Sequence, residues 1–120
     1  MENSLEDIRR LEEEFKSCRK VLNAIGDETR QHLICIMLEC SCEGERVVDI
    51  AKKTNLSRPA VSHHMQILKD ADIVKQRREG TCIYYYLDPD RKAISQLTQL
   101  FQDIELIVSR APNREGEDQA

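Results

Sequence analysis

One stretch of the chain carries side chains that can contact DNA. The spacing predicts a helix over residues 58–71, capped by Ser57, with Val61, Met65 and Leu68 packed inward. The opposite face of this helix carries the polar residues Arg58, Ser62, His63 and Gln66. In a major groove arginine pairs with guanine and glutamine with adenine, while serine or amide groups at a helix amino end bind phosphate. We therefore predict a DNA contact surface here, the alternative being an ordinary solvated helix face.

Two arginines form a second candidate contact. Arg77 and Arg78 precede Glu79 and Gly80, between two β-branched or aromatic runs, and this pattern predicts a hairpin wing over residues 73–87. Guanidinium groups on a narrow projection suit the minor groove or flanking phosphates, so we expect contacts that tolerate changes of DNA sequence. The alternative is a pair of arginines kept for solubility, and Lys75 favours the first interpretation because it extends the same positive line.

The residues before the polar helix must hold it in place. We predict a short helix over residues 47–53 and a turn before Ser57, which together make a helix-turn-helix. Such a motif needs a small residue on the first helix, a residue tolerant of left-handed φ in the turn, and apolar residues that lock the second helix. These roles fall to Ala51, Asn55, Leu56 and Val61. His64 lies between the two faces of the second helix, and we expect it to be packed or bonded to backbone.

Long amphipathic helices are predicted at both ends of the chain. Apolar residues step by three and four over residues 4–25 and again after the helix start at Asp88-Pro89-Asp90. A helix capped by Asp27 and a polar loop over residues 40–46 lie between. The predicted fold class is mainly α with a small β-hairpin: a winged helix-turn-helix with terminal dimerisation helices over residues 1–111, then a polar, disordered tail at 112–120. The terminal apolar stripes exceed what one small domain covers, so we expect a homodimer.

Composition and charge agree with one globular domain. The 120 residues include 40% hydrophobic and 33% charged side chains, with no apolar run long enough to span a membrane, and we expect a soluble cytoplasmic protein. The net charge is −4, yet residues 50–80 hold seven basic and only three acidic side chains. A basic segment inside an acidic protein indicates a surface for a polyanion.

Several motifs carry a resemblance to a known family. They are LNAIGDETR at residues 22–30, VDIA at 48–51, LS at 56–57, AVSHHM at 60–65, RREG at 77–80 and YYYL at 84–87. In this order and register the chain resembles the ArsR-type (arsenic-repressor, SmtB-like) family of bacterial transcription regulators. The resemblance implies a homodimeric winged-helix repressor that binds an operator on double-stranded DNA, with its first and last helices in the dimer interface and an affinity changed by an inducer. One recognition helix and one wing cover only a short half-site, which predicts a pseudo-palindromic operator.

The metal sites that the resemblance implies are not matched in this sequence. A Cys-x-Cys placed before Asp-Ile-Ala would fall on Arg46 and Val48, and residues 90–110 hold no histidine. We therefore do not expect zinc, cobalt or nickel as effectors, and we expect no cofactor.

The odd number of cysteines, five, and the absence of Cys-x-x-Cys predict reduced thiols. Four of them are the remaining candidate sensors: Cys18, Cys35, Cys40 and Cys42. Cys40 and Cys42, in a polar loop near Arg46, are the thiols we expect to react with an oxidant or persulfide. They could also chelate a thiophilic metal, with Cys18 or a thiol of a partner chain as third ligand. Cys35 falls where thiol-sensing members of the family resemble one another, but its apolar helix predicts a buried structural cysteine. The sequence leaves the effector open.

Two functions fit these patterns. The first is a DNA-binding transcription regulator, and the second is a winged-helix dimer that acts only as a protein-interaction module. The basic segment together with Arg77 and Arg78 favours the first. No motif predicts an enzyme.

Overall fold

The chain forms helices around a small antiparallel sheet in this computed structural model, which describes residues 2–40 and 43–111. In chain order the elements are α1 (Leu5–Ser17), α2 (Arg19–Ile25), α3 (Glu28–Glu39), β1 (Glu45–Arg46), α4 (Val47–Lys52), α5 (Arg58–Asp70), β2 (Val74–Glu79), β3 (Cys82–Leu87) and α6 (Lys92–Ser109). Within the described ranges, no helix is long and apolar enough to cross a membrane. The tail expected at 112–120 and the thiol of Cys42 lie outside the described residues.

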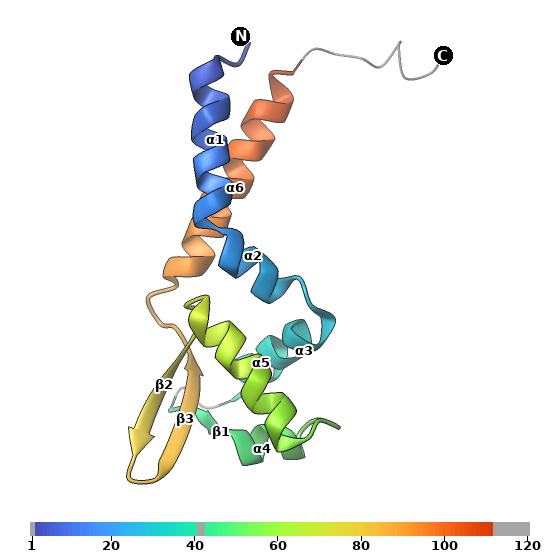
Figure 1. The fold of residues 1–120 in the computed structure, drawn as a ribbon, viewed down its shortest axis with the longest axis vertical. Helices are drawn as coiled ribbons and strands as arrows, with labels where there is room; N and C mark the ends of the chain where they lie inside the picture. Colours follow the sequence, from blue (N-terminus) through green and yellow to red (C-terminus); the bar gives the residue numbers. More distant parts are fainter. Residues whose placement is uncertain (1, 41–42, 112–120) are drawn as a thin grey trace, which may run out of the picture.

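The terminal helices α1 and α6 pack side by side in opposite directions and project from the rest of the molecule (Figure 1). Ser4 begins α1 with a capping box, in which its hydroxyl accepts from Asp7 N at 3.1 Å and the Asp7 carboxylate accepts from Ser4 N at 3.0 Å. At the far end of the pair, Asn3 Nδ2 donates to Ile107 O at 2.9 Å. The two helices therefore meet along one seam within the chain, which their periodicity alone did not predict.

The single helix expected over residues 4–25 is wrong, because the chain turns at Cys18 and divides it into α1 and α2. Cys18 has φ −95° and ψ 3°, and its buried thiol points at Gln96 O, 3.7 Å away on α6. The turn lets α1 follow α6 while α2 packs against α3 and α5. Helical periodicity continues through such a turn, so the sequence pattern does not reveal it.

The winged domain is built around residues that lose all contact with solvent. Leu33 of α3, Ile50 of α4 and the three inward residues of α5, Val61, Met65 and Leu68, are 0% exposed. Burying five such side chains supplies about 1.5–3 kcal/mol each, before the entropy cost of ordering them. The inward face of α5 predicted from the sequence is thus confirmed, and its burial fixes which side chains point outward.

The sheet has the strand order β1-β3-β2, with both pairs antiparallel. The hairpin β2–β3 confirms the predicted wing, and Gly80 at its tip has φ 61°, a left-handed conformation that suits glycine. The loop expected over residues 40–46 is wrong at its end, since Glu45 and Arg46 pair with Tyr85 and Tyr84. A strand of two residues is too short to show any periodicity, and only its partner strand defines it.

Candidate nucleic-acid interface

Ser57 positions the recognition helix α5 at its amino end. Its hydroxyl accepts a hydrogen bond from Ala60 N at 3.2 Å, and Pro59 occupies the first turn, where no amide hydrogen is needed. The turn before it is closed by Thr54, whose hydroxyl donates to Ala51 O at 3.3 Å and accepts from Leu56 N at 3.2 Å. These bonds set the direction in which α5 leaves α4.

The role expected of Asn55 in this turn is wrong. Asn55 was assigned a left-handed backbone, but in the described part of the chain only Asp72 and Arg91, besides two glycines, have positive φ. The side-chain bonds of Thr54 allow the turn to close without left-handed backbone.

The outward face of α5 presents four polar side chains. Arg58, Ser62, His63 and Gln66 are all exposed, opposite the buried apolar row. Gln66 Nε2 donates to Asp70 Oδ1 at 2.9 Å, one turn further along the same helix. To contact a base edge, the amide would have to give up this partner, whereas Arg58 has no such bond to break among the described contacts.

The wing does not present its two arginines together. Neighbouring residues of a strand point to opposite faces, so Arg77 and Arg78 project from different sides of β2. Arg77 is half-buried: it donates from Nη1 to Glu43 O at 2.7 Å and lies 3.1 Å from Glu79 Oε1. Arg78 is exposed and is the more accessible of the two arginines to a polyanion.

Two exposed lysines, one of them from the expected positive line, form ion pairs with neighbouring carboxylates. Lys75 Nζ lies 3.7 Å from Asp88 and 3.9 Å from Asp90, at the foot of the wing. Lys53 Nζ lies 3.0 Å from Glu45 Oε1. These lysines hold the wing and α4 to their neighbours, so they add less to the field outside than their number indicates.

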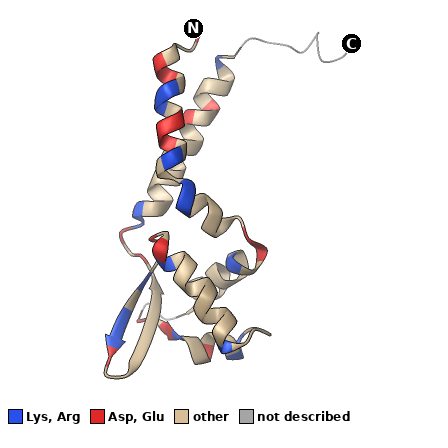
Figure 2. Ribbon diagram, in the orientation of Figure 1, with Lys and Arg blue, Asp and Glu red and all other residues tan. Residues whose placement is uncertain are grey.

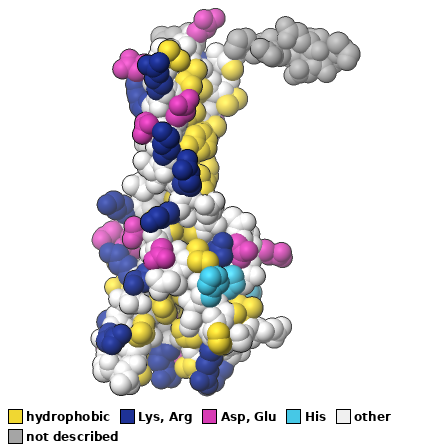
Figure 3. Space-filling model, viewed as in Figure 1, with side chains coloured by type: hydrophobic (Ala, Val, Ile, Leu, Met, Phe, Trp, Pro, Cys, Tyr) yellow, Lys and Arg dark blue, Asp and Glu magenta, His cyan; other side chains and the backbone are white. Residues whose placement is uncertain are grey.

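A group of basic side chains lies at the end of the molecule opposite the termini. Figure 2 shows Lys and Arg there on α4, at the start of α5 and along β2, and Figure 3 shows basic side chains at this end as well as along the terminal helices. The exposed members of this group are Lys52, Arg58, Lys75 and Arg78, of which Lys75 is the one already paired with Asp88 and Asp90. Recognition helix and wing tip therefore carry positive charge in the region where a duplex would lie.

Comparison with known proteins identifies the family. A sequence model described as bacterial regulatory protein, arsR family, matches residues 27–76, from the cap of α3 to the first strand of the wing. An uncharacterized HTH-type transcriptional regulator of Methanocaldococcus jannaschii is 33% identical over 96 residues, covering 77% of this chain and 99% of the relative. The chain belongs to the ArsR family of regulatory proteins.

Further relatives agree with this assignment. The ArsR-family chain is 38% identical over 69 residues to the transcriptional repressor SdpR of Bacillus subtilis, covering 57% of this chain and 72% of that protein. It also matches the homodimeric winged helix-turn-helix DNA-binding domain of a possible ArsR-family regulator from Mycobacterium bovis, with a TM-score of 0.57, 21% identity and coverage of 96% of this chain and 95% of that one. At this identity the second likeness shows the fold alone.

The thiols of this ArsR-family protein are not arranged as the sequence predicted. Cys35 is exposed on α3, so the expected buried structural cysteine is wrong: its helix turns this position away from the core. Cys40 is half-buried instead of open, with Sγ 3.1 Å from Ile36 O and 3.4 Å from Lys53 Nζ. Burial raises the pKa of both Cys40 and Cys18. Among the described residues no group of three or more His, Cys, Asp or Glu is placed to hold a metal ion.

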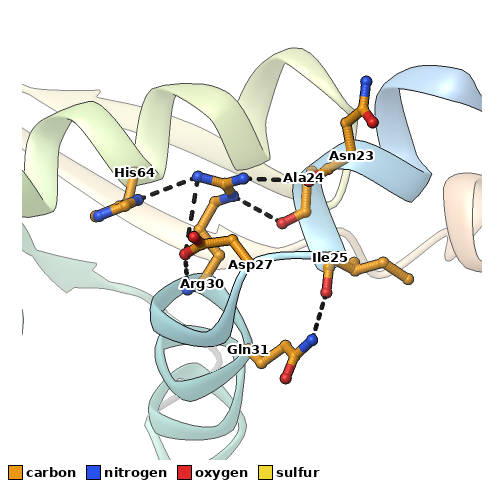
Figure 4. Close-up of polar contacts among 7 residues, drawn as sticks. All are labelled: Asn23, Ala24, Ile25, Asp27, Arg30, Gln31 and His64. Carbon is orange, nitrogen blue, oxygen red and sulfur yellow. Dashed lines mark hydrogen bonds and ion pairs between the residues drawn. The ribbon is translucent and has the colours of Figure 1, made fainter.

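Sequence reasoning missed Arg30, which reaches the recognition helix from α3. Its Nη1 lies 3.3 Å from His64 Nδ1 (Figure 4), so the half-buried His64, which we expected to be packed or bonded to backbone, contacts a side chain of α3. The signal was present in the motif LNAIGDETR, which ends at this arginine. Nothing in the motif indicates the partner, because the contact joins residues 34 positions apart.

Proposed function

We propose that this ArsR-family regulator is a homodimeric repressor whose two copies of α5 read the half-sites of a pseudo-palindromic operator. The observation that carries the proposal is the exposed face of Arg58, Ser62, His63 and Gln66 on a helix whose opposite face is fully buried. Arg58 and Gln66 have the chemistry for guanine and adenine, Ser57 and Ser62 for phosphate, and Arg78 with Arg77 for the adjacent backbone or minor groove.

Exposed apolar side chains on the terminal helices support the dimer. On α1 and α6, Leu5, Phe15, Phe101 and Val108 are 63%, 42%, 51% and 65% exposed. A second copy packed against the same faces would bury them and would place two recognition helices on one side of the assembly. The homodimeric Mycobacterium bovis domain, which shares the fold, supports this arrangement.

The proposed partner is double-stranded DNA, and we place the protein in the cytoplasm, where bacterial and archaeal DNA lies. We propose that any effector acts through a thiol, by oxidation, persulfide formation or capture of a thiophilic metal, and alters the spacing of the two copies of α5. Exposure favours Cys35 over Cys40 as the first thiol to react.

The test is selection of duplexes from a random pool, followed by affinity measurements on the enriched sequence and on scrambled DNA. We expect an inverted repeat bound by a dimer, with affinity that falls steeply as salt rises. Arg58→Ala and Gln66→Ala should each cost about 1–3 kcal/mol of discrimination at one position per half-site. The control is Gln102→Ala, an exposed glutamine on α6.

The outcomes separate the candidate functions. Salt-dependent binding without any enriched motif would contradict the operator, and discrimination unchanged in both variants would contradict the assigned base contacts. A dimer that is not retained on DNA at low salt would favour the protein-interaction module.

A further inference from the structure

Arg30, in the first turn of α3, bonds groups from three other places in the chain (Figure 4). Its side chain is only 14% exposed. Nε donates to Ala24 O at 2.7 Å and Nη2 donates to Asn23 O at 3.1 Å. Nη1 lies 3.9 Å from Asp27 Oδ2 and 3.3 Å from His64 Nδ1. The planar guanidinium holds these groups in one fixed geometry, which a lysine ammonium would not do.

The first three contacts lock the corner between α2 and α3. The carbonyls of Asn23 and Ala24 belong to the last turn of α2, where helix carbonyls lack intrahelical donors. Asp27 caps α3 by accepting from Arg30 N at 3.0 Å, and Gln31 Nε2 donates to Ile25 O at 2.8 Å. Since α2 packs against α1 and α6 as well as α5, this helix links the terminal helices to the winged domain, and the corner lies at its carboxyl end (Figure 1).

The fourth contact reaches the recognition helix. His64 is half-buried on α5 and follows His63, which belongs to the outward polar face, with the two ring centroids 5.7 Å apart. A guanidinium can only donate, so Nδ1 of His64 must accept and the ring must be neutral with its proton on Nε2. The bond to Arg30 therefore exists in only one protonation state of His64.

We propose that Arg30 is a positioning residue for DNA recognition, which holds α5 against the α2–α3 corner through neutral His64, and that protonation of His64 releases this hold. A protonated ring offers no acceptor and brings a second cation within 3.3 Å of the guanidinium. Histidine is the side chain that normally changes charge between about pH 5 and pH 8. The proposal rests on the proposed DNA-binding function, to which it adds a regulation by pH.

Asp27, the other ionisable side chain beside Arg30, does not account for the expected pH dependence. Asp27 is the nearby acid, but its carboxylate already accepts from Arg30 N and pairs with the same guanidinium. The bond from Arg30 lowers the pKa of Asp27, so this group stays ionised over the range in which histidine titrates. Among the described residues, no hydrogen bond or ion pair joins His64 to a charged group of α4 or β2.

The test measures the ratio of operator affinity to scrambled-duplex affinity from about pH 8 to about pH 5.5, where histidine gains its proton. In the unmodified chain we expect the ratio to fall at least about fivefold as pH falls. His64→Asn keeps an acceptor oxygen near the Nδ1 position and does not titrate, so it should retain the high ratio at every pH. Arg30→Lys keeps the charge without the planar fork, so its ratio should be low throughout. His32→Asn, on the exposed side of α3, is the matched control and should behave as the unmodified chain does.

A second measurement does not depend on any variant folding. Nitrogen chemical shifts of the His64 ring in the free protein at high pH should report Nε2–H and a bare Nδ1. The Nδ1–H tautomer would overturn the proposal, as would a His64→Asn profile that falls like that of the unmodified chain. An Arg30→Lys variant with the unmodified ratio and profile would also overturn it. Failure of the DNA-binding function itself would appear differently, as an unmodified chain that has no operator preference at any pH.

Discussion

The guanidinium of Arg77 lies over the ring of Tyr84, with its central carbon 4.9 Å from the ring centroid, and the two residues face each other across the β2–β3 ladder. The same guanidinium reaches Glu43 O in the loop before β1. A stacked and hydrogen-bonded arginine of this kind holds its surroundings as well as carrying charge. The wing thus divides its two arginines between a mainly structural residue and an exposed one.

This division predicts different effects for the two arginines. Arg78→Ala should weaken binding to operator and to scrambled DNA by a similar factor. It should also reduce the slope of log affinity against log salt concentration by about 1, because it removes one phosphate contact. Arg77→Ala should in addition lower the melting temperature, since it leaves Glu43 O without this donor and uncovers Tyr84. Affinity titrations at several salt concentrations and thermal unfolding of both variants check this. Loss of operator affinity alone in Arg78→Ala would mean that the wing reads bases.

The stability of the contact between α1 and α6 should depend on pH through the protonation of Glu14. Burial, reinforced by the neighbouring Asp103 carboxyl, raises the pKa of Glu14 above its ordinary value of 4.5. The folded protein then binds this proton more tightly than the unfolded protein does. Ionised Glu14 therefore lowers the free energy of unfolding at neutral pH, and this penalty is lost as pH falls toward 4.5. Glu14→Gln should raise the melting temperature at pH 7, with a gain that disappears near the ordinary pKa.

The control for this seam is Glu12→Gln, on the exposed side of α1. It removes the same charge without relieving a buried carboxyl, so we expect a small change in melting temperature at each pH. Equal gains from Glu12→Gln and Glu14→Gln would show that overall charge, and not the contact with Asp103, sets the effect.

Dimerisation should depend on the exposed apolar face of α6. Phe101→Glu places a charge at a position that is 51% exposed in one protomer, so the protomer should still fold while association is lost. Gln102→Glu adds the same charge at the next, already polar position and should leave the dimer intact. Sedimentation at micromolar concentration and operator titrations measure both effects. A Phe101→Glu dimer of unchanged affinity would place the interface elsewhere.

Thiol reactivity should follow exposure. Brief alkylation and peptide mapping should label Cys35 before Cys40, and Cys18 last, since burial raises the pKa of the latter two. If the effector acts through Cys35, the Cys35→Ser variant should no longer release DNA in response to an oxidant, persulfide or arsenite. The double variant Cys40→Ser, Cys42→Ser should still release DNA. The opposite pattern would show that the effector acts through Cys40 and Cys42.

The sequence alone was sufficient to predict the surface of α5. Ser57 caps a helix with 3.6 residues per turn. When Val61, Met65 and Leu68 lie in the core, Arg58 and Gln66 must point outward, because the helix geometry determines the direction of each side chain. The wing followed in the same way from two β-rich runs around Glu79 and Gly80. These features depend on residues close together in the chain, whose relative positions one helix or one hairpin determines.

Tertiary structure decided everything that depends on a distant partner. The turn at Cys18 exists because α1 and α2 pack on different neighbours, and the strand β1 exists because β3 lies beside it. The motifs that hold Arg77 and Arg30 do not indicate their partners, yet one stacks on Tyr84 while the other bonds His64. Periodicity records which face of an element is apolar but not what that face meets, so only packing could turn Cys35 outward and bring Arg30 to the recognition helix.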